Sequence, residues 1–286
     1  MPAFFRLLRI KHWIKNFVIF LPAFFGGVFF EVDNVIKLLL VFIVFSLTAS
    51  AIYIFNDLLD YENDKLHPSK KNRPIASGKI SKSFAWTVLL ALLIISAGFA
   101  YIFDFGKGAL IVLGIYFVNN ILYTIFLKKV PIIEFLIVAI GFVLRILIGA
   151  FSIDVQPSKW IIIVTFFVAL YLIITKRRGE FVNNKTTSRE VLKSYNLSFL
   201  DAAMYMSLTA SMISYLMYSV EINLSERFQT DYIYITTVFI VIILLRHLQQ
   251  TLVFGKTESP ISYFYSDVIN FVAIIGFLLT FYFLIY

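Results

Sequence analysis

Apolar residues form long uninterrupted stretches along this chain, and short polar segments separate them. Stretches of about 20 residues match the length that an α-helix needs to cross roughly 30 Å of hydrocarbon at 1.5 Å per residue. The stretches are continuous and lack the alternating polarity, over about ten residues, that an outer-membrane barrel strand would show. The pattern therefore predicts an all-α integral membrane bundle.

We expect this bundle to contain nine transmembrane helices in a single domain that comprises residues 1–286. The expected starts lie near Phe17, Val35, Phe84, Ala109, Ile132, Trp160, Ala203, Tyr232 and Phe264. Each helix should end about 18 to 22 residues later, apart from a shorter first one. The first stretch follows a basic amphipathic segment and has no small-residue cleavage site, so we expect it to be retained rather than removed as a signal peptide.

Composition supports a membrane location and excludes several kinds of site. The chain is 60% hydrophobic and only 15% charged, whereas about a quarter of the residues in soluble domains are charged. It has no cysteine, which excludes structural disulfides, thiolate metal sites and cysteine catalysis. The three histidines, His12, His67 and His247, fall in separate segments, which argues against a zinc site.

Positive charge gathers on one side of the predicted bundle. With nine helices, the N-terminal arm and the loops after the second, fourth, sixth and eighth helices share a side, and they hold most of the 25 Lys and Arg residues. The positive-inside rule places this side, with the N-terminus and the active site, in the cytoplasm, beneath a plasma or inner membrane. The net charge of +8 therefore indicates anionic headgroups or phosphorylated substrates rather than nucleic acid.

An acidic segment, NDLLDYEND, ends the second predicted helix. Asn56, Asp60 and Asp64 recur every four residues, so a continuous helix would place them on one face about 6 Å apart. Mg²⁺ prefers oxygen ligands and usually binds one or two carboxylates together with substrate phosphates. We expect these three residues to bind Mg²⁺ beside a diphosphate. Asp57 and Asp60 are the candidate catalytic residues, with Asp57 acting through a second ion or the outer shell. The alternative is a solvated helix cap or loop cluster.

A basic segment, KLHPSKKNRPIASG, directly follows the acidic one. Its cations Lys70, Lys71 and Arg73 would neutralise phosphate oxygens that the metal does not reach. An ordinary cytoplasmic loop explains the number of these positive charges, but it does not explain why the acidic segment lies directly beside them. The two segments together indicate a phosphorylated substrate.

Several polar groups also interrupt the predicted helices. Arg145 lies about 13 residues into the fifth helix, where contact with lipid would cost a few kcal/mol, so we expect it to face the bundle interior. It would bind a substrate phosphate or a bundle carboxylate, and Glu134 is either such a partner or a helix cap. Asn119, Asn120 and Tyr123 lie about one turn apart and predict either interhelical hydrogen bonds or the lining of a cavity.

The acidic and basic segments, NDLLDYEND followed by KNRPIASGKIS, resemble the first signature of the UbiA superfamily of intramembrane prenyltransferases. Four further segments resemble its decaprenyl-phosphate phosphoribosyltransferase branch: RIKHWIKN at 9–16, GFVLR at 141–145, TKRRGE at 175–180, and residues 189–195. Ile10 departs from the proline that the branch commonly has after the arginine. The resemblance implies a nine-helix bundle with a cytoplasmic-side cavity, where Mg²⁺ bridges the acidic motif to a diphosphate.

The segment after the sixth predicted helix departs from the superfamily enzymes that use prenyl diphosphates. Those enzymes usually carry a second aspartate-rich motif there, whereas this chain reads KRRGEF and shows no Asp-x-x-x-Asp spacing up to Asp201. Such a segment suits a monophosphate that arrives without a metal ion. The resemblance implies 5-phosphoribosyl diphosphate as the donor and a polyprenyl phosphate of the decaprenyl type as the acceptor, in cell-wall biosynthesis.

The expected reaction gives polyprenylphosphoryl-5-phosphoribose and diphosphate. The candidate phosphate-binding residues are Lys15, Lys70, Lys71, Arg73, Arg145, Lys176 and Arg177, and the candidate cavity-lining residues are Asn119, Asn120, Tyr123, Glu180 and Tyr195. The alternative is a prenyltransferase that moves a prenyl group from a prenyl diphosphate to an aromatic or lipid acceptor. A transporter is disfavoured because the sequence shows no inverted repeat and no pair of broken helices. The sequence leaves open which cation binds which phosphate, and whether the chain forms a homo-oligomer.

Overall fold

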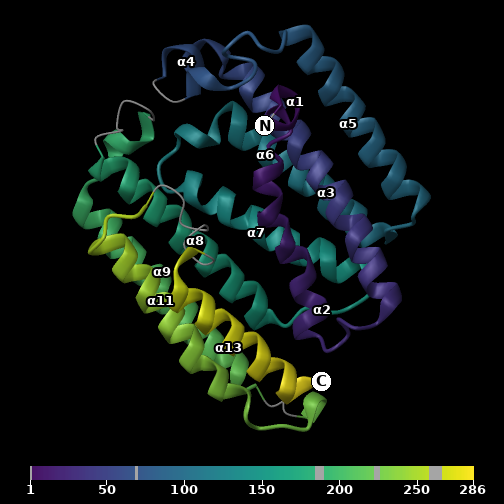
Figure 1. The fold of residues 1–286 in the computed structure, drawn as a ribbon, viewed down its shortest axis with the longest axis vertical. Coiled ribbons are helices and arrows are strands. Elements are labelled where there is room, and N and C mark those ends of the chain that lie inside the picture. The colour runs from purple at the N-terminus through teal and green to yellow at the C-terminus, as the bar shows by residue number, and fades with distance from the viewer. Residues whose placement is uncertain (1, 68–69, 184–189, 222–225, 258–265) are drawn as a thin grey trace. The chain divides into compact units, whose positions relative to one another are not determined.

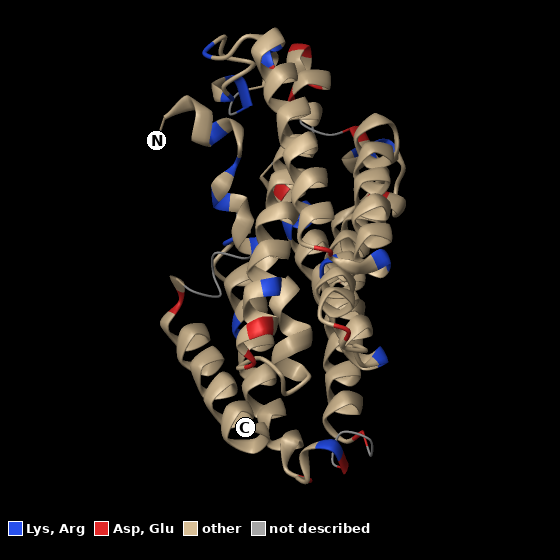
Figure 2. Ribbon diagram, turned by 90° about the vertical axis from the view of Figure 1, so that its right-hand side faces the viewer, with Lys and Arg blue, Asp and Glu red and all other residues tan. Residues whose placement is uncertain are grey.

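The computed structural model describes residues 2–67, 70–183, 190–221, 226–257 and 266–286, and the regular elements in this part of the chain are all helices (Figure 1). Seven of them are long and apolar enough to cross a membrane: α3 (Val32–Leu59), α5 (Lys82–Ile102), α6 (Gly106–Ile125), α7 (Ile133–Ser152), α8 (Lys159–Val182), η6 with α11 (Ile233–Leu252) and α13 (Val268–Ile285). These helices carry few charged residues along their lengths (Figure 2). The prediction of an all-α multi-pass membrane protein is thereby confirmed.

Predicted and observed helix starts agree within three residues for α3, α5, α6, α7, α8 and the helix that begins at Ile233. Helix α9 (Leu197–Ser219) begins six residues before the predicted start at Ala203. It has 23 residues, but its six Ser and Thr residues lower its hydropathy, and it is not among the seven. The predicted start at Phe264 lies outside the described residues, and the count of nine spans stays a prediction.

The first predicted span differs most from the structure. Its residues form the 3-10 helix η1 (Ile10–Phe20) followed by the short helix α2 (Leu21–Phe25), after the N-terminal helix α1 (Ala3–Leu7). A 3-10 helix has three residues per turn, so residues three apart lie on one side. Trp13, Asn16 and Ile19 follow this spacing, and Asn16 and Ile19 are buried. The polar members of this row, Trp13 and Asn16, bond to serines of α3.

The described residues divide into two compact units. The first contains Met1–Leu127 and Leu144–Pro157, and the second contains Lys128–Val143 and Ser158–Tyr286. Helix α7 therefore begins in the second unit and ends in the first.

In the first unit, α3 packs along α5 and against η1 and α6. One apolar cluster in this unit joins α1, the end of α3 and the start of α5, and it includes Leu7, Ile54 and Leu89. Two residues of the loop between α4 (Tyr61–Leu66) and α5, Ile75 and Ile80, belong to the same cluster. The core therefore fixes the loop that carries the basic segment against the helix that carries the acidic one.

In the second unit, α8 packs along α9, and α11 (Thr237–Leu252) packs along α13. The short helix η5 (Glu190–Ser194) supplies Val191 and Leu192 to an apolar cluster with Tyr171 of α8 and Leu200 of α9. Side-chain caps begin α9 and α13: Asn196 accepts from the Phe199 amide at 2.7 Å, and Asp267 accepts from the Asn270 amide at 3.1 Å. Such caps satisfy amides that the first helical turn leaves without partners.

Candidate active site

The acidic motif lies at the junction of α3 and α4. Helix α3 ends at Leu59, and Asp60 takes a non-helical backbone conformation before α4 begins. The four-residue hydrogen bonds nevertheless continue, because the Asp60 amide donates to the Asn56 carbonyl at 3.0 Å and the Asp64 amide donates to the Asp60 carbonyl at 2.8 Å. The backbone therefore keeps helical spacing from Asn56 to Asp64 across the junction.

Two carboxylates of the motif are buried and bound to arginines. Asp57 and Asp64 are 3% and 2% exposed. The Oδ1 atom of Asp57 accepts from Arg9 Nη2 and, at 3.0 Å, from Arg73 Nη1. The same Arg73 nitrogen donates to Oδ2 of Asp64 at 2.5 Å. Burial raises the pKa of the Asp64 carboxyl above its ordinary value, and Arg73 opposes the rise. We call Asp57, Asp64, Arg9 and Arg73 the first cluster.

The loop after α4 determines where Arg73 lies. The Arg73 amide donates to the Lys70 carbonyl at 2.9 Å, and the Arg73 carbonyl accepts from the Ser77 amide at 2.9 Å. Gly78 has a φ of +73°, a conformation that side chains disfavour and glycine tolerates. These turns hold the basic segment against the acidic motif, as the adjacent sequence charges led us to expect.

Arg9 reaches Asp57 from the N-terminal segment. It has a φ of +50°, which is uncommon for a residue other than glycine. Its guanidinium lies 4.8 Å from the centre of the Tyr53 ring, a cation–π distance. The preceding residue, Leu8, accepts a hydrogen bond from the Ser50 hydroxyl of α3 at 2.8 Å. Arg9 is therefore held by its own side-chain contacts and by the hydrogen bond of the residue before it.

A polar seam continues from Arg9 along η1 and α3. The Trp13 indole donates to the Ser50 hydroxyl at 3.1 Å, and the Asn16 amide donates to the Ser46 hydroxyl at 2.8 Å. Pairing each polar group inside an apolar environment avoids the cost of an unsatisfied donor. The polar side chains of Trp13 and Asn16 in the RIKHWIKN segment thus bond to serines of α3.

Arg145 lies at the deep end of this seam and is 5% exposed. Its Nε donates to Asn16 Oδ1 at 2.8 Å, and its Nη2 donates to the Tyr116 hydroxyl at 3.1 Å. The rings of Tyr116 and Phe45 each lie 5.0 Å from its guanidinium carbon. Gly149, one turn further along α7, lets the Ile19 carbonyl of η1 approach, because a Cβ there would lie 2.1 Å from that oxygen.

Lys15 is electrostatically coupled to these arginines. Burial, followed by the positive charges of Arg145 and Arg9, lowers the pKa of Lys15 to about 8. Three cations in one neighbourhood repel one another unless an anion joins them. The structure therefore brings Lys15 and Arg145, two of the predicted phosphate-binding residues, into one electropositive region of the first unit.

The remaining predicted residues of the first unit lie at its surface or are half-buried. Asp60 and Lys70 are half-buried, and Lys71 is exposed. On α6, Asn119, Asn120 and Tyr123 are half-buried, and the Asn120 amide donates to the Tyr116 carbonyl of its own helix at 2.8 Å.

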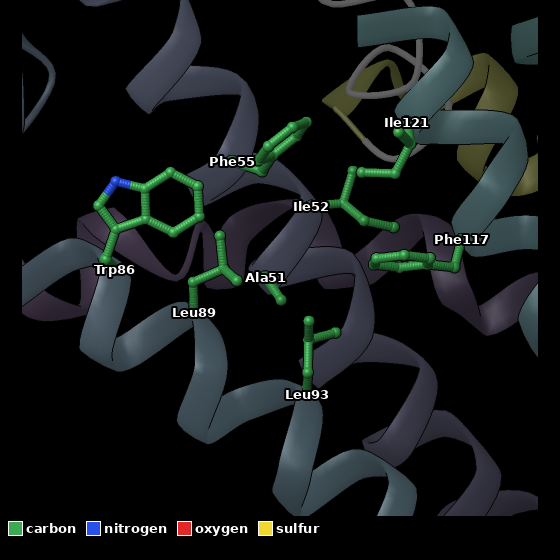
Figure 3. Close-up of a pocket in the computed structure, with 8 residues that line it drawn as sticks. All are labelled: Ala51, Ile52, Phe55, Trp86, Leu89, Leu93, Phe117 and Ile121. Atoms are coloured by element: carbon green, nitrogen blue, oxygen red, sulfur yellow. The ribbon is translucent and has the colours of Figure 1, made fainter. Parts of the chain in front are cut away.

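An apolar cavity of about 180 Å³ lies between α3, α5 and α6 in the first unit (Figure 3). Its lining residues are all apolar: Ala51, Ile52, Phe55, Trp86, Leu89, Leu93, Phe117 and Ile121. An apolar cavity of about 150 Å³ holds a benzene-sized molecule, so this one has room for roughly one isoprene unit. Phe55, one of its walls, directly precedes Asn56 of the acidic motif.

The second unit contains another group of charges, which we call the second cluster: Arg177, Glu134 and Glu180. Arg177 Nε and Nη2 donate to the Glu134 carboxylate at 2.8 to 2.9 Å, and Arg177 Nη1 donates to Glu180 at 3.2 Å. Arg177 is 4% exposed and Glu134 is 0% exposed. We expected Glu134 to serve Arg145 or to cap α7, but the structure pairs it with Arg177.

The basic character expected of KRRGEF is partly neutralised in the fold. Lys176 is exposed, whereas Arg177 is bound to two glutamates and Arg178 Nε donates to Asp201 at 2.5 Å. The charge pattern of the sequence could not reveal this, because Glu134 and Asp201 are 43 and 23 positions from the arginines they bind. Arg189 and Lys185, further cations of this region, lie outside the described residues.

Tyr195, a predicted cavity residue, supports the start of α7. Its hydroxyl accepts from the Ile132 amide at 2.8 Å. Ile132 has a φ of +68°, a strained conformation for a β-branched residue. The Tyr195 ring stacks on Phe135 at 5.1 Å and on Phe199 at 5.5 Å. These contacts place Glu134, two residues after Ile132, where it meets Arg177.

The donor set of the acidic motif fits Mg²⁺ when substrate oxygens complete it. Among the described residues, no group of three or more His, Cys, Asp or Glu side chains is close enough to hold a metal by itself. Mg²⁺ does not need such a group, because one or two carboxylates with phosphate oxygens and waters suffice. Asp57 and Asp64 meet on one nitrogen of Arg73, which shows that both carboxylates can reach a single cation.

Sequence reasoning missed several residues in and around the two clusters. Arg9 counted as a cytoplasmic cation and as part of the RIKHWIKN segment but not as a site residue, and Ser46 and Ser50 were not identified. A signal for the serines existed, because Ser46, Ser50 and Asp57 recur at helical spacing in an otherwise apolar helix. For the pairing of Asp201 with Arg178 the sequence gave no comparable signal.

The chain resembles known proteins both in its sequence and in its fold. The profile of the UbiA prenyltransferase family matches residues 19–266. Decaprenyl-phosphate phosphoribosyltransferase of Corynebacterium glutamicum is 30% identical over 223 residues, which cover 76% of this chain and 67% of that protein. The enzyme of the same name from Mycobacterium tuberculosis is 30% identical over 223 residues, with 76% and 73% covered. A UbiA homologue from Archaeoglobus fulgidus, solved bound to GPP and Mg²⁺, has the same fold, with a TM-score of 0.67 at 17% identity and 99% of each chain covered.

Proposed function

The chain belongs to the UbiA prenyltransferase family and is a membrane transferase, and from this we propose that it transfers a 5-phosphoribosyl group from phosphoribosyl diphosphate to a polyprenyl phosphate. The products are polyprenylphosphoryl-5-phosphoribose and diphosphate. The observation that carries the proposal is 30% identity, over 76% of the chain, to proteins named decaprenyl-phosphate phosphoribosyltransferase. The second cluster adds support, since its carboxylates are bound to arginines rather than spaced as a second aspartate-rich motif.

We assign the donor diphosphate to the acidic motif. Asn56, Asp60 and Asp64 would hold Mg²⁺, and Asp57 would support them through its arginines. The ion, when bound, would neutralise the negative charge that develops on the departing diphosphate. The buried carboxylates and the helical spacing across the junction favour this assignment.

The cations would bind the remaining phosphate groups. Lys70, Lys71 and Arg73 lie in the loop that the first unit holds against the acidic motif. Lys15 and Arg145 are the best candidates for a further phosphate. Burial, and after it the positive charges of Arg145 and Arg9, lower the pKa of Lys15, and a bound anion would offset both effects. Lys176 and Arg177 complete the proposed set. Of these two, the exposed Lys176 is better placed to meet an anion than the buried Arg177.

The chemistry at the ribose C1 atom requires positioning more than proton transfer. Ribosyl centres react through cation-like transition states, so the leaving diphosphate and the incoming phosphate oxygen must be held on opposite faces of the sugar. The acceptor phosphate is already ionised at neutral pH and needs no general base. The protein therefore orients the two phosphorylated substrates, and the bond to diphosphate breaks as the bond to the lipid phosphate forms.

The lipid part of the acceptor would lie among the helices of one domain that comprises residues 1–286. We assign the first isoprene unit to the apolar cavity beside Phe55, which begins next to the acidic motif. The remaining elements of the proposal are nine helices, a cavity on the cytoplasmic side of a plasma or inner membrane, and a role in cell-wall biosynthesis. Asn119, Asn120 and Tyr123 of the first unit, and Glu180 and Tyr195 of the second, stay predicted cavity residues.

A prenyltransferase reaction is the alternative. The structural relative from Archaeoglobus fulgidus was solved with GPP, which keeps a prenyl diphosphate donor in consideration. The arginine-bound carboxylates of the second cluster count against it, because a second metal would have to displace Arg177 from both glutamates.

One assay separates the two reactions. Purified protein with Mg²⁺ receives radiolabelled phosphoribosyl diphosphate and a polyprenyl monophosphate in one tube, and a labelled prenyl diphosphate with an aromatic acceptor in another. We expect label in the lipid fraction of the first tube only. Product in the second tube alone would identify a prenyl-donor enzyme. A donor affinity that is unchanged in the Lys70→Ala, Arg73→Ala double variant would place the donor phosphates elsewhere.

A further inference from the structure

Arg73 contacts the two buried acids of the motif through a single nitrogen atom, Nη1. We propose that Arg73 and Mg²⁺ compete for the carboxylate of Asp64, and that Arg73 moves onto the diphosphate as the metal–diphosphate complex binds. Metal and diphosphate would therefore bind together rather than one after the other. This inference rests on the proposed metal site but not on which molecule carries the diphosphate.

The competition follows from the atoms involved. Mg²⁺ binds carboxylate oxygens directly at about 2.0–2.1 Å, and on Asp64 it would approach the carboxylate that now accepts from Arg73. At 3% and 2% exposure, Asp57 and Asp64 have little contact with water, so a cation must compensate each charge. The guanidinium provides that compensation at 2.5 Å from Asp64 Oδ2. A divalent ion on the same carboxylate would stand close to this guanidinium, and repulsion between the two cations favours release of Arg73.

The two arginines of the first cluster differ in how firmly they are held. Arg9 is 17% exposed and lies against the Tyr53 ring. Arg73 is 24% exposed and extends from a loop. When Arg73 moves, Arg9 still compensates Asp57, whereas Asp64 loses the cation to which it is bound. Asp64 is therefore the carboxylate that the exchange releases to the metal.

Charge balance couples the metal to the diphosphate. Two carboxylates and two guanidinium groups sum to zero in the first cluster. A divalent ion alone would add two positive charges to a partly buried group and displace Arg73 without giving it a new acceptor. A metal–diphosphate complex supplies phosphate oxygens, which are bidentate acceptors for a guanidinium. Each ligand should therefore raise the affinity for the other by the same factor.

The wild-type protein provides the first test. Equilibrium dialysis with radioactive Mn²⁺ as the probe would be run with and without inorganic diphosphate at equal concentration on both sides of the membrane, so that the metal–diphosphate complex in solution cancels. We expect diphosphate to tighten Mn²⁺ binding at least about tenfold, within the usual range of coupling between sites. Equal Mn²⁺ affinity with and without diphosphate would overturn the proposal.

Variants then separate competition from a structural role. In Arg73→Gln we expect Mn²⁺ alone to bind about tenfold more tightly than in wild type, and the effect of diphosphate to shrink below about threefold. Weaker binding of Mn²⁺ alone in this variant would contradict the proposal. If Arg73→Gln does not fold, Arg73→Lys, which keeps the charge, replaces it in the same Mn²⁺ binding measurements. Arg246→Gln, which removes another arginine–aspartate pair, at 2.8 Å from Asp267, should bind Mn²⁺ as wild type does.

Asp64→Asn distinguishes failure of this inference from failure of the metal site. Loss of Mn²⁺ binding in this variant, with and without diphosphate, is the expected result. Wild-type Mn²⁺ binding in Asp64→Asn would remove the proposed metal site, whatever Arg73 does. Loss in Asp64→Asn together with diphosphate-independent binding in wild type would keep the site and reject only the exchange.

Discussion

The first and second clusters both pair arginine with carboxylates, but they differ in how much of the arginine side chain is exposed to solvent. In the second cluster the guanidinium of Arg177 is 4% exposed and is bound at both ends, by Glu134 and Glu180. In the first cluster the acids are buried, while Arg73 is 24% exposed and extends from a loop. Arginine–carboxylate pairing therefore does not by itself indicate a substrate site. The accessible cation is what lets the first cluster exchange partners.

The largest effect should come from opening the second cluster. Glu134→Ala removes the carboxylate that Arg177 binds through two nitrogen atoms, and breaking a buried pair in this way costs about 3–5 kcal/mol. We expect that loss in the free energy of unfolding, measured by equilibrium unfolding in mixed micelles. The double variant Glu134→Leu, Arg177→Met should recover most of it. A loss under about 1 kcal/mol in the single variant would mean that the ion pairs of the second cluster do not stabilise the fold.

Removing a proposed metal ligand should affect catalysis more than folding. Asp64→Asn and Asp60→Asn should each lower kcat about a hundredfold or more, which corresponds to about 3 kcal/mol in the barrier. The free energy of unfolding should change by less than about 1 kcal/mol in Asp64→Asn, because Asp57 still pairs with both arginines. Glu62→Gln is the matched control, since Glu62 is 79% exposed in the same acidic segment. Full Mg²⁺-dependent activity in Asp60→Asn would contradict the metal assignment.

The Lys15 region gives a pH dependence. Its pKa of about 8 means that the side chain is protonated below pH 8 and loses its charge as the pH rises. The affinity for the phosphorylated substrate that it binds should therefore fall above pH 8, by up to about tenfold per pH unit. The KM for each substrate, measured from pH 6.5 to 9.5, reports this. Lys15→Arg stays charged and should flatten the profile, and an unchanged profile in that variant would assign the dependence to another group.

The smallest effect concerns the support of the second cluster. Tyr195→Phe removes the acceptor of the Ile132 amide and keeps the ring that stacks on Phe135. We expect a loss of about 1–2 kcal/mol in the free energy of unfolding, smaller than the loss in Glu134→Ala. Thermal unfolding of both variants in one detergent gives the order. An equal or greater loss for Tyr195→Phe would mean that the strained turn, not the ion pair, holds the start of α7.

The contrast between the clusters also separates what the sequence could and could not predict. Hydropathy located the starts of six long helices within three residues, because a membrane span requires a continuous apolar run. The acidic and basic segments of the first cluster are neighbours in sequence, so their pairing could be expected from charge alone. Glu134 and Arg177 are 43 positions apart, and no local pattern predicts their contact.

Helix η1 shows a further limit of the sequence patterns. Its mixture of apolar and polar residues is compatible with a short membrane span and with a 3-10 helix. In the structure the segment is a 3-10 helix whose Trp13 and Asn16 bond to serines of α3, and these partners lie 37 and 30 positions away in the chain. Periodicity within the segment does not contain that information.

The central claim is that the first cluster, not the second, holds the metal that accompanies the donor diphosphate. It is tested most directly by pulsed electron paramagnetic resonance of Mn²⁺ with phosphoribosyl diphosphate, on protein freed of unbound ligand by gel filtration. We predict a ³¹P coupling at protein-bound Mn²⁺ that disappears in Asp64→Asn and persists in Glu180→Gln. A coupling that persists in Asp64→Asn and disappears in Glu180→Gln would contradict the account and place the metal in the second cluster.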